Sequence, residues 1–177
     1  PVSKFPAFAF RLHQFVSKGD TVFASPEPAL TRHLTLNGQR YVPGHRSRVL
    51  LPLSFCRMRG QDHYTVQRIL DHKGAGLQRA TPRDIGDHHS NDSQSPGFLV
   101  LDEGEIWSDD LDSVLERVPE DWTEESAAGV PRIKAASRNL VPVAVRVDTD
   151  GSFVETGGTR MWWVPAPFRL CIRCGVS

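Results

Sequence analysis

The last seven residues, Cys171-Ile172-Arg173-Cys174-Gly175-Val176-Ser177, share a frame with the earlier segment Phe55-Cys56-Arg57-Met58-Arg59-Gly60. The later segment contains a complete Cys-x-x-Cys-Gly knuckle, in which a tight turn aims two thiolates at one point. In the earlier segment, Arg59 stands where the second cysteine would be. Because two such knuckles normally close on one metal ion, the pair predicts a degenerate zinc-ribbon element that has lost one sulfur ligand.

The three cysteines of the chain all lie in these two knuckles. Tetrahedral zinc takes four thiolate, imidazole or carboxylate ligands. Cys56, Cys171 and Cys174 supply three of them, provided that residues 57–170 form an excursion whose two ends return together. We predict that His63, seven residues after Cys56, supplies the fourth ligand.

Two alternatives to this zinc site are open in the sequence. In the first, Asp62 is the fourth ligand in place of the neighbouring histidine. In the second, no metal binds: Arg59 pairs with an acidic residue such as Asp62, and the three thiols pack as small hydrophobic groups. Arg59 itself cannot bind a metal ion, because its guanidinium stays protonated.

Lysine and arginine balance aspartate and glutamate, 21 against 21, in a chain of 177 residues. This balance excludes a net field that would draw the whole chain onto nucleic acid, although a local basic patch is compatible with it. The length suits one domain with a real core, or one domain with an appendage. Three cysteines, two of them in a Cys-x-x-Cys motif, indicate metal ligation in a reducing compartment. With no signal peptide and no long apolar run, we expect a soluble cytoplasmic protein, and the start without Met suggests a piece of a larger chain.

Composition and periodicity divide the chain into four segments. Residues 1–19 carry apolar side chains at helical spacing and predict a helix that leads out of a preceding domain. Residues 20–70 predict β-hairpins and the first half-knuckle. Residues 71–97 predict a flexible loop, because apolar residues nearly vanish there. Residues 98–177 predict a β-rich insert that returns to the second knuckle.

Strand signals outnumber helix signals along the chain. Asn37-Gly38 and Asp150-Gly151 are typical two-residue hairpin turns, and each stands between strand-like runs. One short helix is expected over residues 109–117. We therefore predict a β-rich α+β fold: an N-terminal helix, β-hairpins and a degenerate knuckle pair that encloses an inserted β-rich subdomain.

No autonomous active site emerges from the sequence. His88-His89 lies in the most loop-like stretch, where a solvated loop is expected. A small hydrolase that uses Cys56 or His63 would need an orienting acid, and none is recognisable. Val100-Leu101-Asp102-Glu103 is read as an ordinary strand end, because no phosphate-binding GxxxxGK[ST] loop occurs in the chain.

Four stretches of the chain carry a resemblance to a known family. They are Phe8-Ala9-Phe10-Arg11-Leu12-His13-Gln14-Phe15, Gly19-Asp20-Thr21-Val22-Phe23, Leu51-Pro52-Leu53-Ser54-Phe55-Cys56-Arg57 and Pro165-Ala166-Pro167-Phe168-Arg169-Leu170-Cys171-Ile172-Arg173-Cys174-Gly175-Val176. Together they resemble a region of large bacterial superfamily 2 DEAD/DEAH-box helicases, the group whose members carry a cysteine-rich zinc-binding element. The stretch from 72 to 141 resembles nothing that we can name.

In such helicases a segment of this kind lies between the two RecA-like motor lobes. The resemblance implies a non-motor accessory domain that contacts the flanking lobes of the same chain and a nucleic acid, DNA rather than RNA. It also implies that ATP and Mg²⁺ bind only in the motor lobes of the parent protein. The motor's phosphate loop, DExH strand and arginine-finger helix are absent from these residues.

Four arginines flank the two knuckles: Arg57, Arg59, Arg169 and Arg173. If the knuckles meet, these guanidiniums predict a patch that contacts phosphates of a nucleic-acid backbone. The alternative is a solvated rim whose arginines pair with carboxylates. A second class of function is also open, a protein-interaction module with no nucleic-acid role that docks through sheet edges or the acidic stretch 102–125.

Overall fold

The structure is a computed structural model that describes residues 21–70, 78–84, 93–104 and 106–175. Strands dominate these residues, and helical segments are short and few. The predicted β-rich α+β fold is therefore confirmed. The helix expected over residues 1–19 lies outside the described residues.

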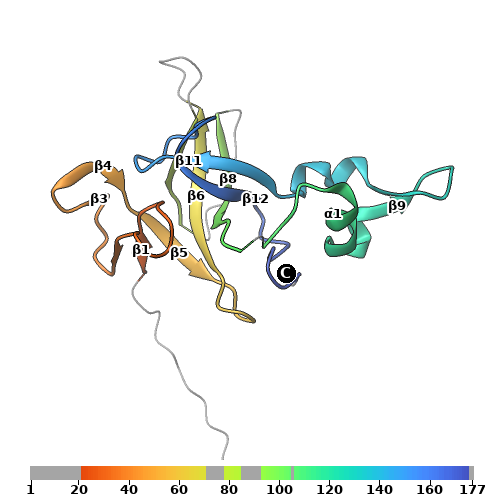
Figure 1. The fold of residues 1–177 in the computed structure, drawn as a ribbon, viewed down its shortest axis with the longest axis horizontal. Coiled ribbons are helices and arrows are strands. Elements are labelled where there is room, and N and C mark those ends of the chain that lie inside the picture. Colours follow the sequence, from red (N-terminus) through yellow and green to blue (C-terminus); the bar gives the residue numbers. More distant parts are fainter. Residues whose placement is uncertain (1–20, 71–77, 85–92, 105, 176–177) are drawn as a thin grey trace, which may run out of the picture.

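One large antiparallel sheet organises the described residues, in the order β11-β12-β8-β6-β5-β1-β2, with β7 also paired to β6 (Figure 1). β6 is its centre, because it pairs with β8 along one edge and with β5 and then β7 along the other. The strands are β1(Phe23–Ala24), β2(Leu34–Thr35), β5(Leu51–Phe55), β6(Asp62–Leu70), β7(Gln78–Pro82), β8(Gln94–Leu101), β11(Val143–Val147) and β12(Thr159–Pro165).

Alternation along the strands sorts side chains onto two faces of the sheet, and each face has its own apolar cluster. Tyr64 stands opposite Leu99 on what we call the first face, and Thr65 stands opposite Phe98 on the second face. The first-face cluster includes Leu51, Leu53, Tyr64, Val66, Leu99, Met161 and Trp163. The second-face cluster includes Phe98, Val100, Trp107, Val114, Trp122, Ile133, Trp162, Val164, Leu170 and Ile172.

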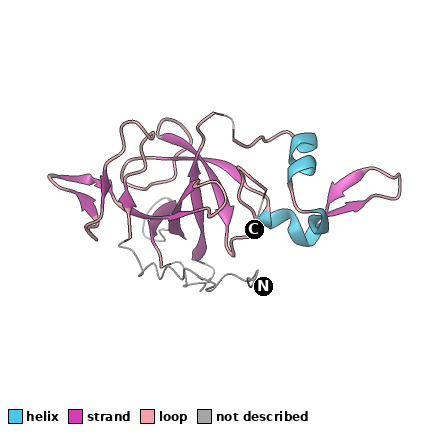
Figure 2. Ribbon diagram, turned by 90° about the horizontal axis from the view of Figure 1, so that it is seen from below, coloured by secondary structure: helices cyan, strands magenta, loops and turns pink. Residues whose placement is uncertain are grey.

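Short helical elements and a small hairpin pack against the second-face cluster through Val114, Trp122 and Ile133. They are α1(Leu111–Arg117), η1(Glu120–Trp122), β9(Thr123–Glu125), β10(Pro131–Ile133) and η2(Ala135–Leu140). Figures 1 and 2 show this region at one end of the main sheet, while the hairpin of β3(Tyr41–Val42) and β4(His45–Val49) lies at the other end. The Asp110 side chain caps α1 by accepting a hydrogen bond from the Ser113 N–H at 3.0 Å.

The hairpin expected around Asn37-Gly38 is wrong. β2, before this turn, pairs with β1, whereas β3, after it, pairs with β4. The chain bends at this point, but the strands on either side of the bend pair with other strands and not with each other. At Asp150-Gly151 the chain does reverse, because the Asp148 N–H donates to the Ser152 carbonyl at 2.9 Å and Val147 bridges to Phe153.

The loop expected over residues 71–97 is wrong in two places. β7(Gln78–Pro82) is a strand, and β8 already begins at Gln94. Both segments are mostly polar, so their apolar content gave no strand signal. They are strands because their backbone groups pair with β6 on its two edges, and Ala80 also donates to the Gly151 carbonyl at 2.8 Å.

Candidate metal centre

The first knuckle is the turn that joins β5 to β6. The Cys56 N–H donates to the Gln61 carbonyl at 2.8 Å, and the Gly60 N–H donates back to the Cys56 carbonyl at 2.8 Å. Gly60 adopts a φ of +67°, which a side chain would strain. The turn therefore keeps the knuckle geometry, although an arginine replaces the second cysteine.

The second knuckle follows β12 and repeats this turn. The Gly175 N–H donates to the Cys171 carbonyl at 2.8 Å, and Gly175 has a φ of +72°. Leu170 and Ile172, on either side of Cys171, are both buried in the second-face cluster. This packing fixes the second knuckle against the sheet.

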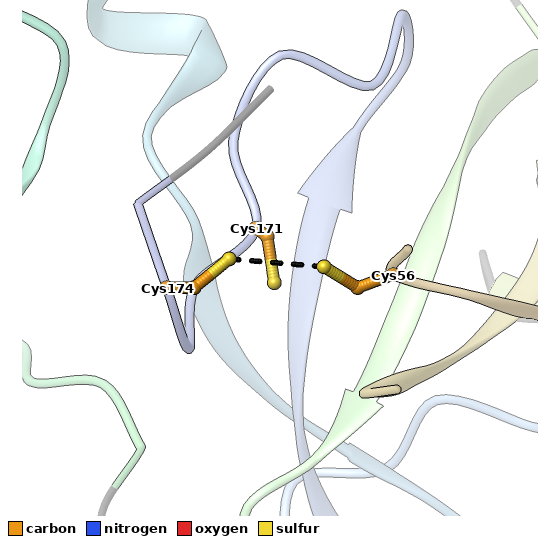
Figure 3. A group of neighbouring side chains, drawn as sticks. All are labelled: Cys56, Cys171 and Cys174. Carbon is orange, nitrogen blue, oxygen red and sulfur yellow. Dashed lines mark hydrogen bonds between the residues drawn. The ribbon is translucent and has the colours of Figure 1, made fainter. Parts of the chain in front are cut away.

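The two knuckles bring their sulfur atoms together. The Sγ atoms of Cys56 and Cys174 are 3.7 Å apart, and the Sγ atoms of Cys56, Cys171 and Cys174 all lie within 4.8 Å of one another. Figure 3 shows the Cys56 sulfur, from the end of β5, directed at the two sulfurs of the C-terminal turn. The predicted excursion over residues 57–170 thus returns to its start, and these three cysteines form a cluster that can hold a metal ion.

The thiols of the cluster differ in acidity. Burial raises the pKa of the Cys171 thiol to about 11, and its hydrogen bonds with the Cys174 and Cys56 thiols also raise it. Burial acts on the pKa of Cys56 in the same direction, but hydrogen bonds from the backbone of Arg59 and Met58 outweigh it, so this pKa is lowered. Cys56 is therefore the more readily ionised of these two thiols, and a bound cation would favour the thiolate of Cys171.

The residues present fit a metal ion that prefers sulfur. Three thiols that converge within bonding reach of one point match the ligand type and spacing of zinc sites with several cysteines. Zinc bound there would be held by Cys56, Cys171 and Cys174, and it would tie the end of β5 to the end of the described chain. No other group of three or more His, Cys, Asp or Glu ligand atoms of this kind occurs among the described residues.

The two candidates for a fourth ligand lie near the first knuckle but outside the group of three sulfurs. Asp62 pairs with Arg32 and accepts from the Gln61 amide at 3.0 Å, so its carboxylate is engaged elsewhere. His63 is buried, and its ring lies edge-on to Phe168 with 5.0 Å between the centroids. Its assignment as the fourth ligand stays a prediction.

The knuckle arginines are exposed, and two of them share a cleft. Arg59 and Arg173, one from each knuckle, line a hollow of about 240 Å³. Arg173 contacts the Gln61 side-chain oxygen at 3.5 Å. The ion pairs between described residues include neither of these two arginines, nor Arg57 or Arg169.

One residue that positions the site gave no signal in the sequence. Arg117, at the end of α1, donates to the backbone carbonyl of Ile172 inside the second knuckle and to that of Ile106 at 2.8 Å. Its guanidinium also lies 4.7 Å from the centre of the Trp107 ring. A basic residue in the last turn of a helix is common, so nothing marked it as a support for a turn 55 residues away.

Comparison of the chain with known protein families, with curated proteins and with solved structures finds no match to any of them. Among the described residues, no helix has the length and apolar character needed to cross a membrane.

Proposed function

We propose that this chain is a non-motor accessory module of an ATP-dependent nucleic-acid helicase, in which a zinc ion clamps two knuckles and nearby arginines contact the nucleic-acid backbone. The observation that carries the proposal is the convergence of Cys56, Cys171 and Cys174. The helicase context is drawn from the resemblance of the chain's sequence stretches to the zinc-binding region of superfamily 2 helicases. DNA is the expected nucleic acid.

The cleft between the knuckles supports a contact with phosphate. Arg59 and Arg173 line the same hollow, so an anion that enters it meets cationic side chains from both knuckles. Asp62 and Glu103 also line it, but each already has a partner: Asp62 pairs with Arg32, and a Glu103 oxygen accepts from the Ala29 N–H at 2.8 Å. Arg32 neutralises the charge of Asp62, whereas Glu103 stays anionic, so the two arginines outnumber the one carboxylate of the hollow that has no cationic partner.

A clamp of this kind would give the arginines a fixed spacing. Arg59 is three residues after Cys56, and Arg173 directly precedes Cys174. A metal ion that holds both sulfurs would hold both arginine-bearing turns at the same time. The proposed role of the metal is thus structural, and no chemical step is assigned to it.

Binding of fluorescent single- and double-stranded DNA, titrated over a range of salt concentrations, tests this function. We expect the double variant Arg59→Ala/Arg173→Ala to bind more weakly and to reduce the salt dependence of log K, by about 0.7–0.9 for each phosphate that the variant no longer neutralises. Arg132→Ala is the matched control, because Arg132 is exposed and pairs with Glu124 in the β9–β10 hairpin. Equal binding by all three proteins would contradict the nucleic-acid role.

A protein-interaction module with no nucleic-acid role is the second candidate, and one observation favours it. The region around α1 holds a cleft of about 810 Å³ lined by Asp102, Trp107, Ser108, Asp109, Asp110, Ser113, Glu116, Arg117 and Arg160. Its four carboxylates outnumber its two arginines, so it suits a basic partner segment. Under this alternative, the arginine substitutions in the knuckles leave partner binding intact, whereas Asp109→Lys weakens it.

A further inference from the structure

The register of the sheet places His63 on the same face as Cys56. Ser54 of β5 stands directly opposite His63 of β6. The ladder continues to Cys56, whose N–H donates to the Gln61 carbonyl at 2.8 Å. Cys56 lies two residues beyond Ser54, so its side chain emerges on the same side as those of Ser54 and His63. Diagonal neighbours of this kind are about 7–8 Å apart, a span that two side chains can close around a single ion.

The second knuckle reaches this face too. Phe168, three residues before Cys171, lies edge-on to the His63 ring with 5.0 Å between the centroids. Phe98 of β8 flanks the same imidazole at 6.3 Å. Leu170 and Ile172 belong to the apolar cluster of this second face. His63 therefore lies in the layer that joins the two knuckles.

The imidazole of His63 is buried and has a ring nitrogen free to bind a metal ion. It is only 1 % exposed, and its Nε2 atom has no hydrogen-bond partner. Burial lowers its pKa, while a hydrogen bond to the backbone of Gln61 opposes the fall. Because Nε2 has no partner, it is the ring nitrogen that remains available to a metal ion.

A buried acceptor without a partner is costly, because it has lost its hydrogen bonds to water. Histidines that bind metals commonly donate their other ring N–H to a backbone carbonyl, which sets the tautomer and leaves the remaining nitrogen for the ion. At His63 the nitrogen left for an ion is Nε2, which is buried and has no hydrogen-bond partner. It supplies an observation at the site that is independent of the three sulfurs.

From these contacts we propose that Nε2 of His63 completes a Cys₃His site with Cys56, Cys171 and Cys174, a site for zinc or another divalent ion that prefers thiolate and imidazole. This inference rests on the metal clamp of the proposed function. Nε2 lies outside the group of sulfurs that are within 4.8 Å of one another, so binding requires the ring to turn toward them. Three thiol protons are released to solvent, and the neutral imidazole gives up none.

Asp62 is the weaker ligand for this position. Its carboxylate pairs with Arg32 and accepts from Gln61, and a role as ligand would break both contacts. Register also places it on the first face, because Asp62 stands opposite Phe55 and not opposite Ser54. His63 and the buried residues Leu170 and Ile172 of the second knuckle lie on the second face.

Cobalt(II) substitution in the whole chain tests the assignment, because the visible spectrum of Co²⁺ reports its ligand set. We expect the wild type to give a tetrahedral spectrum that added imidazole does not change. His63→Ala should bind Co²⁺ and Zn²⁺ at least about tenfold more weakly, and added imidazole should restore the wild-type spectrum by filling the vacated position. His33→Ala, which removes a half-buried histidine near β2, is the control and should match the wild type.

Three results separate the possibilities. If His63→Ala has the spectrum and affinity of the wild type, the assignment of His63 is overturned while the three-cysteine clamp stands. If the wild type binds no Co²⁺ or Zn²⁺, the clamp itself fails, and with it the proposed function. Should His63→Ala not fold, X-ray absorption of the zinc-loaded wild type decides: imidazole scattering beside three sulfurs supports the assignment, and its absence contradicts it.

Discussion

The Sγ atoms of Cys56 and Cys174 lie 3.7 Å apart, although the two residues are 118 positions apart in the sequence. The intervening chain contains most of the main sheet and all of the helical region. A metal ion at this point would close a very long loop. Because an ion that binds the folded chain in preference to the unfolded chain stabilises it by mass action, the clamp links metal binding to the stability of the whole fold.

Removal of metal should therefore lower the melting temperature. With free zinc at about 100 times its dissociation constant, the expected contribution to the free energy of unfolding is about 2.7 kcal/mol. Differential scanning fluorimetry with and without a chelator measures the loss. Cys174→Ser should already melt at the lower temperature and respond little to the chelator. An equal response in both proteins would show that the chelator acts elsewhere.

Gly97→Ala should destabilise the fold by about 1–3 kcal/mol, because the strand there has no room for a methyl group. A Cβ at Gly97 would lie 2.5 Å from Cη2 of Trp163 and 2.9 Å from the Val164 carbonyl oxygen. Gly38→Ala is the matched control, since its nearest neighbours are atoms of Phe23 at 3.9 Å. Urea unfolding of both variants measures the difference, and equal midpoints would contradict the packing at Gly97.

Tyr64 should make the fold sensitive to alkaline pH. Burial raises the pKa of Tyr64 from 10.0 to about 12, because the charged phenolate is disfavoured inside the sheet, although Arg32 opposes the rise. The folded state thus keeps a proton that the unfolded chain loses. The resulting stability is fully present below about pH 10 and falls as the pH rises toward about 12, by roughly 2–3 kcal/mol in all.

Tyr64→Phe tests this dependence. Urea unfolding at about pH 9 and pH 11.5 should show a smaller fall in stability for the variant than for the wild type. At neutral pH the variant loses the hydrogen bond that Tyr64 donates to the Ser25 carbonyl at 2.9 Å, a cost of about 0.5–1.5 kcal/mol. Tyr41→Phe, at the surface, is the control. Parallel losses in all three proteins would rule out Tyr64 as the source.

Arg117→Gln should weaken both the fold and the metal site. The guanidinium holds the backbone of the second knuckle through the Ile172 carbonyl, and hydrogen bonds from a charged donor contribute about 1.5–3 kcal/mol. Urea unfolding and zinc competition measure the two effects. Arg138→Gln, at an exposed position of η2, should change neither. Unchanged zinc affinity in Arg117→Gln would mean that the knuckle keeps its shape without this support.

The sequence was sufficient for the parts of the site that depend on local turns. The glycines after each knuckle and the cysteine spacing predict two turns of one kind, and Gly60 and Gly175 both adopt the left-handed conformation that these turns require. The meeting of the two knuckles followed from the four-ligand rule for zinc. The return strand after the first knuckle could also be predicted, because β-branched and aromatic residues follow the turn, among them Tyr64, Thr65 and Val66.

Other parts of the fold depend on partners distant in sequence. The turn at Asn37-Gly38 indicated a hairpin, yet β2 and β3 each pair with a different strand. β7 has few apolar residues, and its backbone pairing with β6 and with the segment around Gly151 makes it a strand. Arg117 supports the second knuckle because tertiary packing brings α1 next to it. No local sequence pattern predicts this contact.

The zinc content of the purified chain, measured by elemental analysis beside Cys174→Ser, tests the metal clamp most directly. We expect about one zinc per chain in the wild type and a clear loss in the variant. A cooperatively folded wild-type chain that holds no zinc would contradict the metal clamp. The three thiols would then be packed as small hydrophobic groups without a metal ion.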